Sequence, residues 1–360
     1  MNSPVVLHID SGRSFRGGQR QISLLLDRIA QYGIASILAV PSDSPVLDKL
    51  PAIDKITLST TSLFRKLFLG ELKNIIDYRG VDIIHAHDSE AHTIGIALKK
   101  AFPKIKLVVS RRVVFPPSGQ FSAIFKYRRH VDKYVAVSEA SAEVLKSIGV
   151  KHDTIVVIHS ALDIDAILAI EKFSSRGNDF VTRYPKLVLS AGALTEEKDY
   201  STAIKAFHRA SLNHPDAGMM ILGDGPLKTK LQNLIDHLQA PNILLAGHVE
   251  PMTPLMKCAH LFVLSSRSEG LNNSVTEAAV CGVPSIVSNV GGLPEIIMHS
   301  QNGFLCEPGD VDSFAQAIDT LLSDESLQRK MALNASDSVR KFDISELCQK
   351  TAELYNSLLA

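Results

Sequence analysis

Long apolar runs are scarce in this sequence of 360 residues. No apolar stretch reaches the roughly 18 residues of a membrane-spanning helix, and the N-terminus lacks the basic, apolar and small-residue segments of a secretion signal. Cysteines are few, and the spacing of Cys258, Cys281, Cys306 and Cys348 matches no zinc or redox motif. Because 45% of the residues are nevertheless apolar, we expect a cytoplasmic protein with reduced thiols and two domains of ordinary size.

Signatures of several binding classes are also missing. No G-x-G-x-x-G and no G-x-x-x-x-G-K-[ST] occurs, which argues against a dinucleotide dehydrogenase and a P-loop NTPase. No sequence repeat with a period of roughly 20–50 residues is evident. The basic stretch 126–130 is too short and isolated to predict a nucleic-acid partner.

The total charge of zero conceals an uneven distribution. Residues 1–165 contain 22 Lys and Arg against 16 Asp and Glu, which leaves 16 and 22 for the remainder of the chain. A basic first half suggests that this half faces an anionic partner. Chance scatter of charge over a large surface is the alternative.

Short β-branched runs alternate with helical patterns along the whole chain. One helix is expected where apolar side chains recur at intervals of three and four, at Ile22, Leu25, Leu26 and Ile29. The alternation predicts an α/β protein with parallel sheets and helices on both faces. The expected strands are residues 5–9, 35–40, 83–86, 106–109, 134–137, 187–191, 218–222, 243–246, 261–264 and 285–287.

The strand and helix pattern occurs twice. It weakens into a polar, mixed stretch near residues 166–186 and then restarts. We expect a Rossmann-like domain over 1–165, a linker over 166–185, a second Rossmann-like domain over 186–343, and a last helix at 344–360 that packs back on the first domain. Doubly wound domains bind ligands at the carboxyl ends of their strands.

The segment 265–277, SSRSEGLNNSVTE, follows one of the expected strands. Its glycine and asparagines suit a loop with exposed backbone N–H groups, and a helix is expected to start near Ser274. A strand, an amide-rich loop and a helix N-terminus together form an anion site suited to a diphosphate. Glu277, in the first helical turn, can accept two hydrogen bonds from a ribose diol.

Both glutamates of this segment also have plainer interpretations. Ser274-Val-Thr-Glu277 matches a capping box, in which Glu277 serves only its own helix. Glu269 matches a solvated loop carboxylate, the usual state of an exposed acid. The spacing alone does not choose between these interpretations and a ligand site.

Glu269 and Glu277, eight positions apart with Gly270 after the first, resemble the E-x7-E motif of retaining GT-B glycosyltransferases. The wider pattern resembles glycosyltransferase family 4, because further motifs follow in order along nearly the whole chain. They are the glycine pair 17–18, the D-x-x-H-x-H run 82–87, the V-S pair 137–138, the strand 157–163 before the linker, the loop 192–198, and the segments 223–227, 247–249 and 291–295. The resemblance implies the GT-B architecture, two Rossmann-like domains facing across a cleft.

The resemblance also implies roles for residues of this chain. Glu277 would bind the donor ribose, Glu269 would lie beside the donor sugar, and Lys198 would neutralise the diphosphate. His87 would lie near the transferred sugar, and 224–227 with 247–248 would border the base. Besides the catalytic set His87, Lys198 and Glu269, the implied donor-binding set is Gly17, Gly18, Gly192, Lys198, Gly225, Pro226, Leu227, His248, Glu269, Gly270, Leu271, Asn272, Asn273 and Glu277.

The chain departs from the family pattern at three places. Ala193 stands where the family often has an arginine beside the lysine, and this removes a bidentate phosphate ligand. Ser160-Ala161 replaces the usual Asn-Gly, and Asn272 stands where Pro or Gly is common. Arginines of the glycine loop are candidates to compensate for Ala193, namely Arg13, Arg16 and Arg20.

Neither a metal nor an organic cofactor is expected. His85 and His87 lie two apart on a strand end and point the same way, but no third ligand is evident, and His85 is also interpretable as a buried histidine. Asp163 and Asp165 spell D-x-D, a string of metal-dependent transferases of another fold that occurs easily by chance.

Two basic amphipathic stretches, 64–68 and 121–129, suit contact with anionic lipid or a phosphorylated acceptor. Alternatively, each stretch has one face in the protein core and the other in solvent. The sequence does not decide whether the protein contacts the inner face of the membrane.

The expected reaction moves a sugar from a UDP- or GDP-sugar to a glycan or lipid-linked acceptor, such as lipopolysaccharide or another cell-surface polysaccharide. Retention at C1 is implied by the resemblance, and Lys198, helix N-termini and loop amides would stabilise the departing phosphate. The alternatives are an epimerase or hydrolase of the same fold, an inactive nucleotide-sugar-binding module, and an enzyme like glycogen phosphorylase, which would need a pyridoxal lysine and a longer chain.

Overall fold

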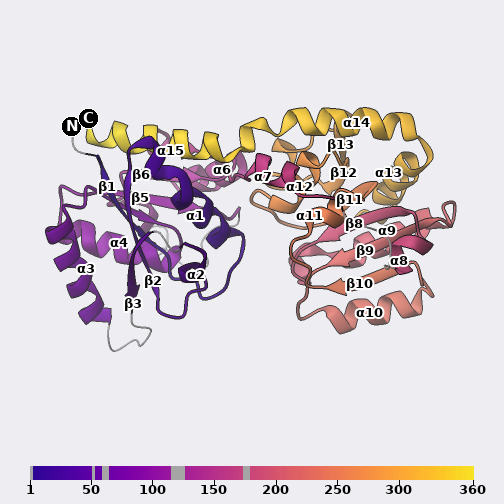
Figure 1. Cartoon of the computed structure of the whole chain (residues 1–360), viewed down its shortest axis with the longest axis horizontal. Coiled ribbons are helices and arrows are strands. Elements are labelled where there is room, and N and C mark those ends of the chain that lie inside the picture. The colour runs from indigo at the N-terminus through magenta and orange to yellow at the C-terminus, as the bar shows by residue number, and fades with distance from the viewer. Residues whose placement is uncertain (1–2, 51–52, 59–64, 115–125, 173–178) are drawn as a thin grey trace. The chain divides into compact units, whose positions relative to one another are not determined.

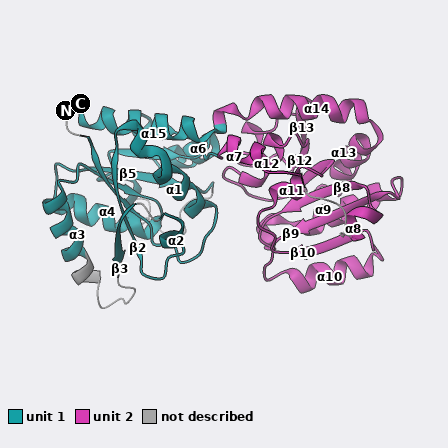
Figure 2. Ribbon diagram, in the orientation of Figure 1, with its two compact units in different colours: residues 1–161, 342–360 teal, residues 162–341 magenta. Residues whose placement is uncertain are grey.

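The computed structural model describes residues 3–50, 53–58, 65–114, 126–172 and 179–360. The chain forms two compact units, residues 1–161 with 342–360 (unit 1) and residues 162–341 (unit 2), as Figure 1 and Figure 2 show. Each unit holds one parallel sheet covered by helices, so the α/β fold with two Rossmann-like sheets is confirmed. Among the described residues, no helix combines the length and apolar character needed to span a bilayer.

The sheet of unit 1 has seven strands in the order β3-β2-β1-β4-β5-β6-β7, and every neighbouring pair is parallel. Because the strand order changes direction between β1 and β4, the loops that follow these two strands diverge and leave a switch point at their carboxyl ends. The strands are β1 Val5–Ile9, β2 Ala35–Pro41, β3 Asp54–Leu58, β4 Ile83–Ala86, β5 Lys106–Arg111, β6 Lys133–Ala136 and β7 Ile155–Val157.

Helices cover both faces of this sheet and bury two apolar clusters against it. One cluster joins Ile22 and Leu25 of α1 to Cys348 and Tyr355 of α15. The other cluster lies under α3, α4 and α6. Asp88 and Ser138 start two of the helices, since their side chains accept the first free N–H groups. The helical segments are α1 Gly17–Arg28, η1 Ile29–Tyr32, α2 Val46–Lys49, α3 Arg65–Arg79, α4 Ser89–Ala101, α6 Glu139–Ser147, η3 His152–Thr154 and α15 Ile344–Leu359.

The sheet of unit 2 has six strands in the order β10-β9-β8-β11-β12-β13, again parallel throughout. Its switch point lies between β8 and β11. The core cluster under this sheet includes the fully buried Phe207 and Phe314. The strands are β8 Lys186–Ala191, β9 Ala217–Leu222, β10 Ile243–Gly247, β11 Leu261–Leu264, β12 Ser285–Ser288 and β13 Gly303–Cys306.

Eleven helical segments surround or connect to this sheet in the described chain. They are α7 Ile164–Ala169, α8 Asp179–Arg183, η4 Glu196–Lys198, α9 Tyr200–Ser211, α10 Lys228–His237, α11 Thr253–Met256, α12 Asn273–Val280, η5 Leu293–Glu295, α13 Val311–Ser323, α14 Glu325–Ser338 and η6 Arg340–Phe342.

Several boundaries differ from those expected. The range 166–185, expected as a linker, contains the end of α7 and all of α8. Val181 and Tyr184 are buried, and Tyr184 packs beside Gly218 of β9, so this segment is part of unit 2. The strand expected at 157–163 lies instead at 155–157. Strands β3 and β13, at the sheet edges, were not expected from the sequence.

Candidate active site

The predicted donor residues of unit 2 lie at one edge of its sheet. Parallel strands end at the same edge, so the loops that follow β8, β9, β10 and β11 gather there. Gly192 directly follows β8, and Lys198 ends the short η4 turn in the same loop. The loop after β11 carries Glu269 and leads into α12.

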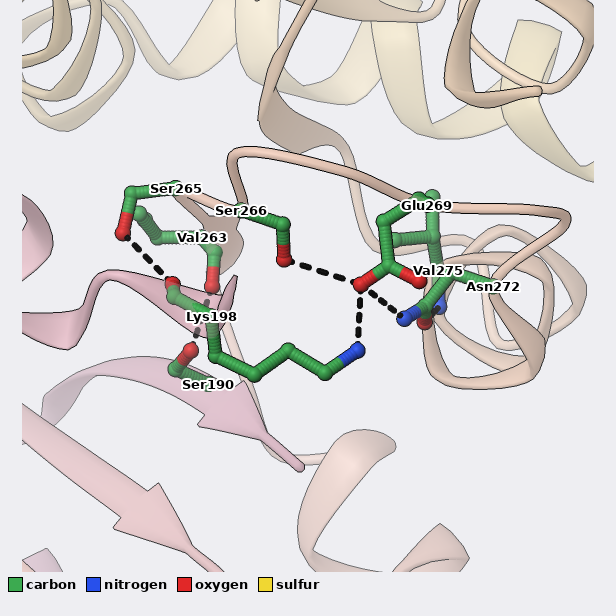
Figure 3. Close-up of polar contacts among 8 residues, drawn as sticks. All are labelled: Ser190, Lys198, Val263, Ser265, Ser266, Glu269, Asn272 and Val275. Atoms are coloured by element: carbon green, nitrogen blue, oxygen red, sulfur yellow. Dashed lines mark hydrogen bonds and ion pairs between the residues drawn. The ribbon is translucent and has the colours of Figure 1, made fainter. Parts of the chain in front are cut away.

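Lys198 and Glu269 form an ion pair across the switch point (Figure 3). One carboxylate oxygen of Glu269, Oε1, receives three hydrogen bonds: from Nζ of Lys198, from Oγ of Ser266 at 2.8 Å and from Nδ2 of Asn272 at 3.1 Å. Both charged side chains are mostly buried, with 19% of Lys198 and 10% of Glu269 exposed. Glu269 is therefore not the solvated loop carboxylate that the plainer interpretation assumed.

Asn272, rather than Ser274, caps α12. Its Oδ1 accepts the N–H of Val275 at 3.1 Å, while its Nδ2 holds Glu269. The capping box at 274–277 is therefore wrong, because the helix begins at Asn273 and Glu277 lies beyond its first turn. Helix geometry leaves the N–H groups of Asn273 and Ser274 without acceptors inside α12, so they are available at its N-terminus.

Glu277 is buried inside unit 2. Only 1% of it is exposed, and its Oε1 accepts a hydrogen bond from Oγ1 of Thr253 at 2.5 Å. Thr253 begins α11, which follows β10. A carboxylate with one oxygen held by a neighbouring hydroxyl has a fixed orientation, and this is what recognition of a ligand diol requires.

Two glycines allow the loops of this edge to approach closely. A Cβ on Gly291, whose φ is +54°, would lie 1.7 Å from the carbonyl oxygen of Glu269. A Cβ on Gly225 would lie 2.6 Å from the carbonyl oxygen of Leu194. Glycine is needed at both positions, and Gly291 thereby sets the place of the loop that carries Glu269.

The remaining predicted donor residues of unit 2 belong to neighbouring loops. The N–H of Leu227 donates to Leu194 at 3.1 Å, which joins the segment with Gly225 and Pro226 to the loop after β8. Gly270 and Leu271 lie between Glu269 and the cap of α12. His248 follows β10 and is exposed, 3.5 Å from Glu250. The fold thus brings these residues to one edge, and their roles toward a ligand stay predictions.

Unit 1 carries a cluster of three buried histidines. His8 of β1 pairs in register with His85 of β4, and His87 follows directly after β4. Nδ1 of His8 lies 3.0 Å from Nε2 of His87, and the rings of His85 and His87 lie 4.1 Å apart. Burial lowers the pKa of His8 to about 3 and also lowers the pKa values of His85 and His87, so all three are neutral at pH 7.

His8 supplies the third histidine that the sequence did not reveal. Ring nitrogens of the three residues lie within 4.8 Å of one another, which is close enough to consider a metal ion. However, His85 bonds Tyr355 at 2.5 Å and Ser110 at 2.8 Å, and Nδ1 of His87 lies 3.3 Å from Nη2 of Arg112. Because these nitrogens have protein partners and a guanidinium lies against the cluster, the residues fit a network of neutral imidazoles better than a cation site.

The glycine pair lies next to this cluster. Gly17 and Gly18 open α1, and a Cβ on Gly18 would lie 3.6 Å from Cδ of Arg112. Arg13, a candidate to compensate for Ala193, is instead exposed and lies 3.8 Å from Asp43. Of the basic amphipathic stretches, residue 64, the side chains of 65–68 and residues 121–125 lie outside the described residues.

Two family profiles together cover most of the chain. Residues 15–166 match Glycosyltransferase Family 4, and residues 177–338 match Glycosyl transferases group 1. With two Rossmann-like sheets and a match to both family profiles, the protein is a glycosyltransferase of the GT-B class. The chain belongs to family 4, the group 1 glycosyltransferases, and it transfers a sugar from a nucleotide sugar to an acceptor.

Solved structures share the fold at low sequence identity. HepE of Anabaena, solved in complex with UDP, has a TM-score of 0.85 at 20% identity and covers 98% of this chain and 99% of its own. Among sequence relatives, N-acetyl-alpha-D-glucosaminyl L-malate synthase of Bacillus anthracis is 24% identical over 299 residues, 81% of this chain and 78% of the relative. The lipopolysaccharide core biosynthesis glycosyltransferase LpsE of Rhizobium meliloti is 24% identical over 331 residues, 91% of each chain.

Proposed function

We propose that the protein transfers a sugar from a UDP-sugar, with retention at C1, to a hydroxyl of a glycan or lipid-linked acceptor. The observation that carries this proposal is the Lys198–Glu269 pair beside the N-terminus of α12. A mostly buried cation, a mostly buried carboxylate and free backbone N–H groups at one edge of one sheet support the proposal.

Each part of the donor matches a different part of this site. The diphosphate is attracted by Lys198 and by the N–H groups of Asn273 and Ser274. The buried carboxylate of Glu277 accepts both hydroxyls of the ribose. Glu269, already hydrogen-bonded through one oxygen, uses the other toward hydroxyls of the sugar.

In the proposed reaction the bond between C1 and the β-phosphate oxygen breaks, and its electron pair leaves with UDP. The acceptor oxygen bonds to C1 on the same face, and its proton passes to the departing phosphate. Lys198 and the helix N-terminus stabilise the charge that grows on this phosphate. A product of inverted configuration, detected by NMR, would contradict front-face attack.

The choice of UDP and of the acceptor rests on relatives. HepE was solved with UDP and with UDP-glucose, and LpsE is described as acting in lipopolysaccharide core biosynthesis. The excess of basic residues in the first half of this chain agrees with an anionic acceptor of that kind.

A nucleotide-sugar binding panel, measured by calorimetry, tests the donor site. We expect UDP and at least one UDP-sugar to bind the wild type, and both Lys198→Ala and Glu277→Ala to weaken this binding about 10- to 100-fold. Leu333→Ala, an exposed position on α14, is the matched control. If neither site variant weakens binding, the site assignment fails.

A further inference from the structure

Arg112 is a half-buried arginine in unit 1 that the proposed donor site does not use. It follows β5 directly and lies between two features of unit 1, His87 and Gly18. The preceding residue, Arg111, points to the opposite face of the sheet, where its Nη1 donates to the hydroxyl of Tyr127 at 2.9 Å. The two adjacent arginines therefore have different surroundings, and only Arg112 lies beside the glycine pair.

The charge of Arg112 is incompletely compensated. Among the described residues, no carboxylate forms an ion pair with its guanidinium, and its Nε is a buried polar atom with no hydrogen-bond partner. Burial lowers its pKa to about 10, and the charge of Asp10 offsets only part of this effect. A half-buried guanidinium whose Nε lacks a partner is stabilised when an anion completes its surroundings.

His87 does not take the place of that anion. Arginine has only donors, so Nη2 of Arg112 donates to Nδ1 of His87 across 3.3 Å. A neutral His87 must then carry its proton on Nε2, where it meets Nδ1 of His8 at 3.0 Å. His87 thus offers one neutral acceptor and no charge, while the other N–H groups of Arg112 stay available.

The space around Arg112 is small. A cavity lined by polar and apolar side chains, among them His85, Arg112, Val135 and Ile158, has room for one or two water molecules. Gly18 lies beside Arg112 without a side chain of its own, so a larger ligand would approach the guanidinium from there. There, the first N–H groups of α1, a helix of 12 residues, add to the positive potential of the guanidinium.

We propose that Arg112, beside the glycine pair, binds a phosphate or carboxylate group of one of the two substrates. This proposal rests on the proposed function, because the anionic group is assumed to belong to the sugar donor or to the acceptor. It gives unit 1 an anion-binding cation of its own. The donor diphosphate and an anionic acceptor are the two sources of the same chemistry.

Arg112→Met and Arg112→Lys test this assignment in the full-length protein, with Arg79→Met as control, because Arg79 is an exposed arginine of unit 1 paired with Asp54 at 3.0 Å. We expect Arg112→Met to raise the thermal midpoint of the ligand-free protein, because it removes a half-buried charge that has no ion-pair partner among the described residues. A residue with a merely structural role would lower it. Arg112→Lys should retain part of the anion affinity.

Two calorimetric titrations identify the source of the anion. If the anion belongs to the donor, Arg112→Met weakens UDP about 10- to 100-fold and leaves uridine unchanged. If it belongs to the acceptor, UDP affinity is unchanged, and inorganic phosphate titrated into the UDP-saturated protein binds the wild type but not Arg112→Met. The proposal is overturned if Arg112→Met lowers the thermal midpoint and leaves both affinities within about twofold of wild type. Lys198→Ala is measured in parallel. If Lys198→Ala weakens UDP binding while Arg112→Met does not change either affinity, the donor site stands and only the assignment of Arg112 fails.

Discussion

Replacing Glu269 by glutamine separates the two charges at the switch point of unit 2. The amide oxygen of a glutamine can still accept from Ser266 and Asn272, but Lys198 loses its anionic partner. Breaking a fully buried ion pair costs about 3–5 kcal/mol. Because 19% of Lys198 and 10% of Glu269 remain exposed, we expect the free energy of unfolding to fall by about 2–3 kcal/mol.

The same variant should bind UDP at least as well as the wild type. In the ligand-free protein the carboxylate of Glu269 occupies Lys198, so a diphosphate must compete with it for the amine. Glu269→Gln removes this competition, and we expect UDP affinity to be unchanged or up to about tenfold higher. Sugar transfer should nevertheless fall about 100-fold or more, because the carboxylate that contacts the sugar is lost.

Urea unfolding followed by circular dichroism, UDP calorimetry and an assay of sugar transfer measure the three quantities. Lys198→Met is the partner variant, with UDP binding weakened about 10- to 100-fold. The double variant should be more stable than the two separate losses predict, since each single change removes the same pair. If Glu269→Gln weakens UDP as much as Lys198→Met does, the reasoning about competition is wrong.

Three further outcomes follow from the described contacts. Because His8 has a pKa of about 3 in the folded protein and about 6.5 when unfolded, the unfolded chain binds its proton first on acidification. The free energy of unfolding should therefore fall by about 1.3 kcal/mol between pH 7.5 and 5.5 on account of His8, and His8→Asn should show a flatter pH dependence in urea titrations. Asp10 behaves in the opposite way: burial and repulsion from Asp88 raise its pKa to about 6, so its contribution is most favourable at low pH and is lost as pH rises through 6. Asp10→Asn should then raise the thermal midpoint at pH 8 and not at pH 4, and equal shifts at both values would contradict this. Asn272→Asp keeps the cap of α12 but turns a donor to Glu269 into a charge that repels it, whereas Asn272→Gly costs the cap only a few tenths of a kcal/mol. Transfer rates should fall further for aspartate than for glycine, and the reverse order would show that the cap matters more.

The central strands could be predicted because they are buried on both faces. Strands such as Ile83–Ala86 and Leu261–Leu264 have every position buried and are apolar except for His85, and the sequence ranges match the structure. The edge strands β3 and β13 lack this signal. Asp54 and Lys55 open β3, and β13 begins with a glycine. Such short mixed runs become strands only because a partner strand supplies hydrogen bonds along one side.

The motif residues of the site could be predicted, but their pairing could not. In a parallel sheet, the loop after each strand begins at the ligand-binding edge. Lys198, Glu269 and Glu277 could therefore be assigned to that edge from the order of strands and loops. Which side chains meet in the folded protein depends on the order and register of the strands in space. Lys198 and Glu269 are 71 positions apart, and His8 and His87 are 79 positions apart. The one available signal was that His8 and His85 each lie within an expected strand.

The departures from the family pattern have different structural consequences. Asn272, which replaces the Pro or Gly that is common in the family, adds two hydrogen bonds. Its Oδ1 caps α12 and its Nδ2 donates to Glu269, which neither Pro nor Gly can do. Ala193, by contrast, supplies no cation of its own. Of the arginines in the glycine loop, Arg13 lies at the surface, 3.8 Å from Asp43. Arg112 was not among the candidates from the sequence, and its Nε is buried without a hydrogen-bond partner in the described structure. A buried polar group without a partner costs far more than an exposed one, and this is the physical reason for assigning an anion to Arg112.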